Sequence, residues 1–143
     1  MILTAEQFER ITKTLKSERS RSDERRVNPR VSLSGALEVI QIVASDRPIV
    51  PFRARLRDFS STGIGLLIPS ALPKGCRLVV ILPPGDSEYG GLLCEVVRQQ
   101  TVSGGSVQVG ASFIERLTTG SITHFRAGNV HELARLLGNA EAA

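Results

Sequence analysis

Aromatic residues are scarce in this sequence, which has no tryptophan, one tyrosine and five phenylalanines, or 4% of its 143 residues. Surfaces that bind single-stranded nucleic acid usually carry several aromatic side chains for base stacking, so this scarcity disfavours that class of protein. No apolar run approaches the roughly 20 residues that a membrane-spanning helix needs, and we expect no insertion into a membrane. The first residues also lack a basic segment followed by an apolar one, so no secretory signal is expected.

Cysteine and histidine are equally sparse. Cys76 and Cys94 lie on apolar segments without a second cysteine nearby, which is typical of small core residues in a reduced, cytoplasmic protein. The two histidines, His124 and His131, are not spaced with the cysteines as metal ligands usually are. The chain also has no H-E-x-x-H, G-x-S-x-G or Walker motif. We therefore predict no metal, no cofactor and no enzyme active site.

The composition is that of a globular domain, with 41% apolar and 22% charged residues. The net charge is +4, and residues 1–30 hold eight basic and five acidic side chains, so that +3 of it lies in this segment. A positive field concentrated at one end of the chain would attract an anionic ligand towards it.

The most informative stretch runs from Arg25 to Arg30 and reads Arg-Arg-Val-Asn-Pro-Arg. Pro29 lacks a backbone N–H and disfavours helical geometry in the residue before it, so the segment is expected to be extended or turning. In an extended chain Arg26 and Arg30 point to the same side, with Cα atoms roughly 13 Å apart. Guanidinium groups bond phosphates and the edge of guanine, so the run is either a clamp for a phosphorylated guanine ligand or a solvated basic linker.

Beyond residue 30 the pattern changes to short β segments separated by turn signals. The expected strands cover residues 36–43, 52–56, 64–68, 78–82, 92–97 and 107–113. No helix-length segment separates them, as a parallel α/β sheet would require, so they predict a small six-stranded antiparallel barrel. Arg53, Arg55 and Arg57 alternate with apolar residues and give one strand a basic face, which is either solvated or contacts a ligand or partner.

Helices are predicted at both ends of the chain. Thr4 and Gln7 have the spacing of a capping box, and the helix that follows is expected to end near Ser17. Its apolar stripe most simply packs on the domain, with a partner or homodimer contact as the alternative. Asn129 and Gly138 bracket a second helix, and residues 120–125 add a helical turn. The expected organisation is a helix and basic linker (1–24), a mainly β barrel (25–117) and a helical tail (118–143).

A second motif follows the basic strand as a predicted polar turn from Asp58 to Gly63. Asp58 could accept hydrogen bonds from the N–H groups of guanine or hold an arginine. Ser60 offers a hydroxyl or a local bond to the backbone, and Gly63 permits a positive φ or a close approach to a ligand.

Taken together, the two motifs resemble the PilZ domain, a family of bacterial receptors for cyclic diguanylate (c-di-GMP). Its signature is R-x-x-x-R followed by D/N-x-S-x-x-G, and Arg26 to Arg30 and Asp58 to Gly63 match the two parts. Ile64-Gly65-Leu66 and Gly110-Ala111-Ser112-Phe113 are similar to further family features.

The resemblance implies a role for each motif residue. Arg26 and Arg30 would bind phosphates and guanine edges from a segment that wraps the ligand. The barrel side of the pocket would be formed by Asp58, Ser60 and Gly63. Arg25 would favour a stacked, two-molecule form of the ligand.

The expected function is therefore a cytoplasmic, non-enzymatic c-di-GMP receptor that relays binding to a partner protein as a conformational change. Two alternatives stay open at this point: a protein adaptor of the same fold that binds no ligand, and a basic barrel that binds nucleic acid. The scarcity of aromatic residues disfavours long nucleic acid as the partner.

Overall fold

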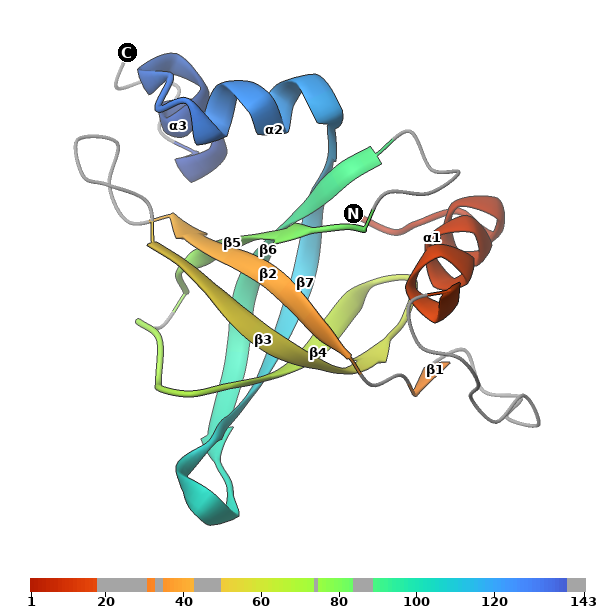
Figure 1. The fold of residues 1–143 in the computed structure, drawn as a ribbon, viewed down its shortest axis with the longest axis vertical. Helices are drawn as coiled ribbons and strands as arrows, with labels where there is room; N and C mark the ends of the chain where they lie inside the picture. Colours follow the sequence, from red (N-terminus) through yellow and green to blue (C-terminus); the bar gives the residue numbers. More distant parts are fainter. Residues whose placement is uncertain (18–30, 33–34, 43–49, 74, 84–88, 139–143) are drawn as a thin grey trace.

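The computed structural model describes residues 1–17, 31–32, 35–42, 50–73, 75–83 and 89–138 (Figure 1). The arginine run 25–30 and the predicted boundary between residues 24 and 25 lie outside these ranges. The elements in chain order are α1 (Ala5–Ser17), β1 (Val31–Ser32), β2 (Ala36–Ile42), β3 (Val50–Phe59), β4 (Gly63–Ile68), β5 (Arg77–Ile81), β6 (Tyr89–Thr101), a 3-10 turn (Ser103–Gly105), β7 (Val107–Thr118), α2 (Thr119–Arg126) and α3 (Val130–Leu137).

Within the described residues, six strands close into an antiparallel barrel in the order β3-β2-β5-β6-β7-β4, and β4 pairs back onto β3. The two-residue strand β1 adds to β3 beside the barrel. The mainly β fold with an amino-terminal and a carboxy-terminal helix is thus confirmed. Its physical basis is visible in β4, where buried and partly exposed residues alternate along the strand.

Two apolar clusters hold the fold together. The interior of the barrel forms the first, and Leu3, Ile11 and Leu15 place one face of α1 on it. The second lies outside the barrel, where α2 and α3 cover β2, β5 and the start of β6 (Figure 1). Because β5 is covered on both sides, Leu78, Val79 and Val80 form a continuous apolar run rather than an alternating one.

The helix ends have the predicted caps. The Thr4 N–H donates to Gln7 Oε1 at 2.9 Å, and the Gln7 N–H donates to Thr4 Oγ1 at 3.1 Å. Asn129 Oδ1 accepts from the Glu132 N–H at 2.9 Å, and Gly138 ends α3 with a φ of 82°. These bonds satisfy backbone groups that a helix leaves unpaired at its ends.

Several boundaries differ from the sequence-based expectation. The weak helical turn at 120–125 is the two-turn helix α2, which the Thr118 side chain caps. Strands β6 and β7 are longer than expected, because they pair with each other from Tyr89 opposite Thr118 to Thr101 opposite Val107. Asp58 and Phe59 belong to β3, so the polar turn predicted from Asp58 begins only at Ser60.

The cysteines differ in environment. Cys94 is fully buried, as predicted, and burial raises the pKa of its thiol. Cys76 is only partly buried, just before β5. No helix in the described part of the chain is long and apolar enough to cross a membrane.

Candidate functional site

A hollow of about 310 Å³ lies on the outer surface of the barrel, over the end of β3 and strands β4, β7 and β6. Three of the predicted site residues, Asp58, Ser60 and Gly63, line it together. The other three, Arg25, Arg26 and Arg30, lie outside the described residues. The structure therefore brings together the barrel part of the predicted site.

The floor of the hollow is a single row of paired residues that crosses four strands. Asp58 pairs with Gly65, Gly65 pairs with Gly110, and Gly110 pairs with Arg98. Because the two central residues are glycines, the middle of the row has no side chain of its own. With adjacent strands about 4.8 Å apart, the backbones at its two ends are about 14 Å from each other.

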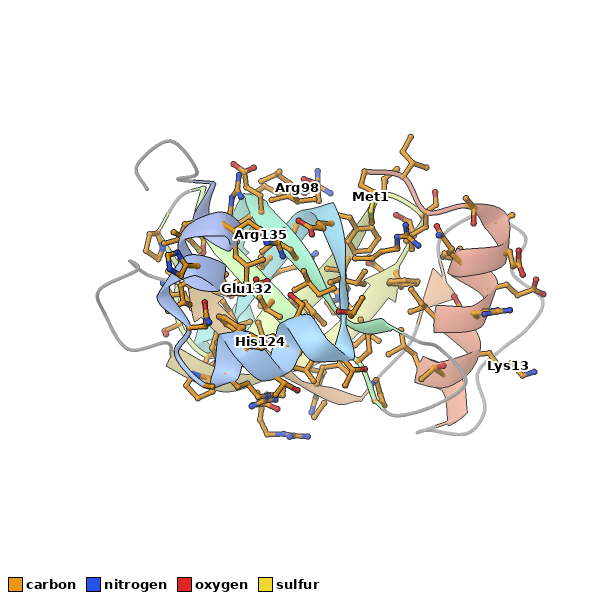
Figure 2. The ribbon with its side chains drawn as sticks, turned by 90° about the horizontal axis from the view of Figure 1, so that it is seen from above. Met1, Lys13, Arg98, His124, Glu132 and Arg135 are labelled. Carbon is orange, nitrogen blue, oxygen red and sulfur yellow. The ribbon has the colours of Figure 1, made fainter. Side chains whose placement is uncertain are left out.

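The two charged residues lean over the two glycines. A Cβ atom added to Gly65 would lie 2.7 Å from Asp58 Oδ1, and one added to Gly110 would lie 3.2 Å from Arg98 Nε. A carboxylate and a guanidinium group thus face the hollow from opposite ends. Figure 2 shows Arg98 at the outer surface of the barrel, well apart from Lys13 on α1.

Two irregularities in the strands put these charged residues on the outside. The pairing register shifts between Leu56 and Asp58 in β3, and between Val96 and Arg98 in β6. Strict alternation from the buried Leu56 would turn Asp58 inward, and the same holds for Arg98 after the buried Val96. Each bulge inserts one extra residue and so reverses the alternation.

The turn between β3 and β4 is organised by the Ser60 hydroxyl. Its oxygen accepts from the backbone N–H groups of Thr62 and Gly63, both at 3.2 Å. The Ser60 N–H donates to the Gly63 carbonyl at 2.9 Å. The local backbone bonding that was one prediction for Ser60 is confirmed, and it shapes the turn beside the hollow.

Gly63 is needed for close packing of two strands. A Cβ atom here would lie 2.5 Å from the Ala111 carbonyl oxygen on β7. Gly63 is not among the described glycines with positive φ. The positive φ expected as one reason for this glycine is therefore not adopted, and the group that approaches Gly63 closely is a neighbouring backbone.

Helix α1 rests directly on the second motif. Phe59, the residue between Asp58 and Ser60, is fully buried, and its ring stacks on Phe8 of α1 with centroids 5.3 Å apart and planes 5° apart. The Leu3 N–H donates to the Ser61 carbonyl at 2.8 Å. A displacement of the 58–63 motif would therefore act on α1.

Sequence reasoning did not identify Arg98 as a site residue. Gly65 and Gly110 stand in stretches that resemble family features, but no local pattern around Arg98 shows that it joins their row. Elsewhere, His124 and His131 are exposed, and no group of three metal-binding side chains occurs among the described residues.

Comparison with known families identifies the domain. The sequence model of the PilZ domain family matches residues 21–128, three quarters of the chain. The chain belongs to the PilZ domain family. This is a family of c-di-GMP receptor domains, and no family of enzymes is indicated.

Comparison with individual proteins adds a similarity among solved structures. No curated protein matches the chain. Among solved structures, this PilZ domain is similar to the Bacillus subtilis inhibitor of motility (MotI/DgrA), with 16% sequence identity and a TM-score of 0.42. The match covers 85% of this chain and 52% of the other, so the chain spans about half the length of that protein.

Proposed function

We propose that this PilZ domain is a receptor for c-di-GMP. The observation that carries the proposal is the hollow itself, where Asp58 and the Ser60–Gly63 turn share a floor with Arg98. The R-x-x-x-R motif at 26–30 precedes this site in the sequence, in the order of the signature that the two motifs resemble.

The chemistry of the hollow suits a guanine nucleotide. The Asp58 carboxylate can accept two hydrogen bonds from the ring N–H and the amino group of guanine. Across the row, the Arg98 guanidinium can stack on a purine face or bond a phosphate. The two glycines between them leave room for these charged side chains, which lie over the glycine backbone from the two ends of the row.

The remaining contacts come from the arginine motif in this proposal. Ligand pockets usually measure about 300–1,000 Å³, and the hollow lies at the lower end of this range. We expect it to hold part of the ligand, while Arg26 and Arg30 bind phosphates and guanine edges. Arg25 would favour two stacked ligand molecules over one.

Binding is relayed to a partner protein through α1. Contacts with the ligand act on the Ser60–Gly63 turn, and this turn is joined to α1 by the Leu3 hydrogen bond and the Phe8–Phe59 stack. A ligand that binds one position of the turn better than another shifts the population of α1 positions.

Isothermal titration calorimetry with c-di-GMP tests the proposal. We expect saturable binding to the full chain and binding at least about tenfold weaker for Arg26→Ala and for Arg98→Ala, since a bond to a charged group contributes about 1.5–3 kcal/mol. Lys13→Ala, which removes one positive charge from the outer side of α1, should bind like the wild type.

Each result has a defined meaning. Absence of binding at tens of micromolar ligand would contradict the proposal and favour an adaptor that binds no ligand. A stoichiometry near two ligands per chain would support the role of Arg25, and one near unity would remove it. Wild-type affinity in Arg98→Ala would restrict the site to the two sequence motifs.

A further inference from the structure

Strand β3 carries a stripe of exposed arginines that the ligand site does not use. We call Arg53, Arg55 and Arg57 the arginine stripe. All three are exposed, whereas Ala54 and Leu56 between them are buried in the barrel. The basic face predicted from the sequence is therefore present on the outer surface.

Several other arginines in the described part of the chain have acidic partners, which the stripe lacks. Arg10, Arg126 and Arg135 each form an ion pair with a glutamate. In the part of the chain that the structure describes, no carboxylate pairs with a member of the stripe.

The carboxylate that lies opposite the stripe on β2 is already bound by another arginine. Glu38 lies opposite Arg53 in the register of β2 and β3, but its carboxylate accepts hydrogen bonds from two guanidinium N–H groups of Arg126, at 2.6 and 3.1 Å. The charge of Arg53 adds to the lowering of the pKa of Glu38, but neighbouring like charges on one strand repel each other, so the fold alone does not account for the whole stripe. Its arrangement is explained better by an anionic partner.

We infer that the arginine stripe docks an extended, acidic segment of a partner protein. Arg53 and Arg55 stand two residues apart in the regularly paired part of β3, so their side chains are about 6.8 Å apart, and carboxylates at every second position of an extended segment have the same spacing. At Arg55, β3 is paired with both β2 and β4, so an added strand has no free edge there and side chains must form the contact.

Other anionic partners fit the surface less well. Phe52, the aromatic residue of β3 nearest the stripe, packs against the barrel core, so it is not available for stacking on a base. The large apolar side chains exposed in the described residues are Met1 and Ile2, which precede α1, and Val97 on β6, so β3 has no apolar anchor for a lipid surface.

The stripe borders the ligand hollow. Arg55 pairs with Leu67, and the next paired positions in the same two strands are Leu56 with Leu66 and then Asp58 with Gly65. A segment docked on the stripe would therefore lie beside bound c-di-GMP. Only this last consequence rests on the proposed function; docking itself does not.

Fluorescence anisotropy with a short labelled peptide of alternating glutamate and threonine tests the inference. We expect salt-sensitive binding to the full chain, weakened at least about tenfold by Arg55→Glu. Lys13→Glu makes the same charge change on α1 and should leave affinity within about twofold of the wild type. The double variant Arg53→Gln/Arg55→Gln, which removes two positive charges without adding negative ones, should lose binding too. Thermal melts verify that each variant is folded.

Three results would overturn the inference: no binding of the peptide, equal loss in Lys13→Glu, or equal binding of a peptide in which the same glutamates are contiguous. Tighter binding of oligothymidylate or of phosphatidylserine vesicles, lost in Arg55→Glu, would assign the stripe to nucleic acid or membrane instead. Titration of c-di-GMP separates the two proposals, because peptide binding by a chain that binds no c-di-GMP supports the stripe and contradicts only the receptor function.

Discussion

At the scale of single residues, Gly63 and Gly65 stand two positions apart in β4 but have different roles. Beside Gly63 lies the Ala111 carbonyl, a backbone group that cannot move without disturbing the pairing of β4 with β7. Beside Gly65 lies the Asp58 carboxylate, which is the end of a side chain and can rotate away. The first glycine serves the fold, and the second serves the position of a charged group.

We therefore predict opposite outcomes for the two alanine variants. Gly63→Ala should lower the free energy of unfolding by about 1–3 kcal/mol, because the added methyl group forces the strands apart. Gly65→Ala should keep nearly the wild-type melting temperature and weaken c-di-GMP binding, because it displaces Asp58. Thermal melts and calorimetry measure both effects.

Gly120→Ala on α2 is the matched control, since a Cβ atom there has no neighbour closer than 3.9 Å. It should leave ligand binding unchanged. If Gly65→Ala binds c-di-GMP like the wild type, the position of Asp58 does not matter for the ligand.

At the scale of elements, α1 is the helix most closely connected to the candidate site. Its Phe8 ring is partly buried and stacks on Phe59, which in turn contacts Phe113 with centroids 5.6 Å apart. The three rings form a continuous packing path from the helix through the motif to β7. Removal of Phe8 should therefore affect both stability and ligand binding.

We predict that Phe8→Ala lowers the free energy of unfolding by about 2 kcal/mol, less than for a fully buried ring because Phe8 is partly exposed. It should also change the affinity for c-di-GMP, because the turn loses its support. Urea denaturation and calorimetry provide the two measurements. Arg10→Ala, on the exposed side of α1, should change stability by less than about 0.5 kcal/mol. An unchanged ligand affinity in a destabilised Phe8→Ala protein would show that α1 supports the fold without coupling to the site.

At the scale of the whole molecule, α2 and α3 are fastened by polar contacts at the edge of their apolar cover. Arg126 of α2 binds Glu38 of β2, and Arg135 of α3 binds Glu115 of β7 and Glu132. The hydrogen bonds from these arginines hold the pKa of Glu38 and of Glu132 below the ordinary value of 4.5. Both carboxylates are therefore more stable as anions in the folded protein.

This predicts a loss of stability in acid. Since the folded pKa is lowered, the stabilisation is complete above the unfolded pKa of about 4.5 and is lost as pH falls through the folded value. Thermal melts between about pH 6 and pH 3 should show a smaller fall in melting temperature for Glu38→Gln than for the wild type. The difference is modest, because the pair is partly exposed and screened by water and salt.

Glu9→Gln, which removes an exposed carboxylate from α1, is the control and should behave like the wild type in acid. Identical acid curves for wild type and Glu38→Gln would mean that the Arg126 pair contributes nothing measurable to folding.

The sequence by itself determined the elements, the helix caps and the family. Alternation along strands and capping side chains act within a few residues, so local patterns suffice to locate the barrel strands, α1 and α3. The same holds for Asp58, Ser60 and Gly63, which belong to one short sequence motif, and for the arginines of β3, which alternate with buried residues.

Only the tertiary structure decided which distant residues meet. Two bulges reverse the alternation in β3 and β6, and no local pattern marks them, because a bulge depends on how the paired strand fits. Through them Asp58 and Arg98 turn outward and face each other across Gly65 and Gly110. The second apolar cluster under α2 and α3 is likewise a result of packing, since β5 alone does not show what covers its outer face. The reason is common to both: contacts between residues far apart in the chain depend on strand register and on closure of the barrel, which no short segment contains.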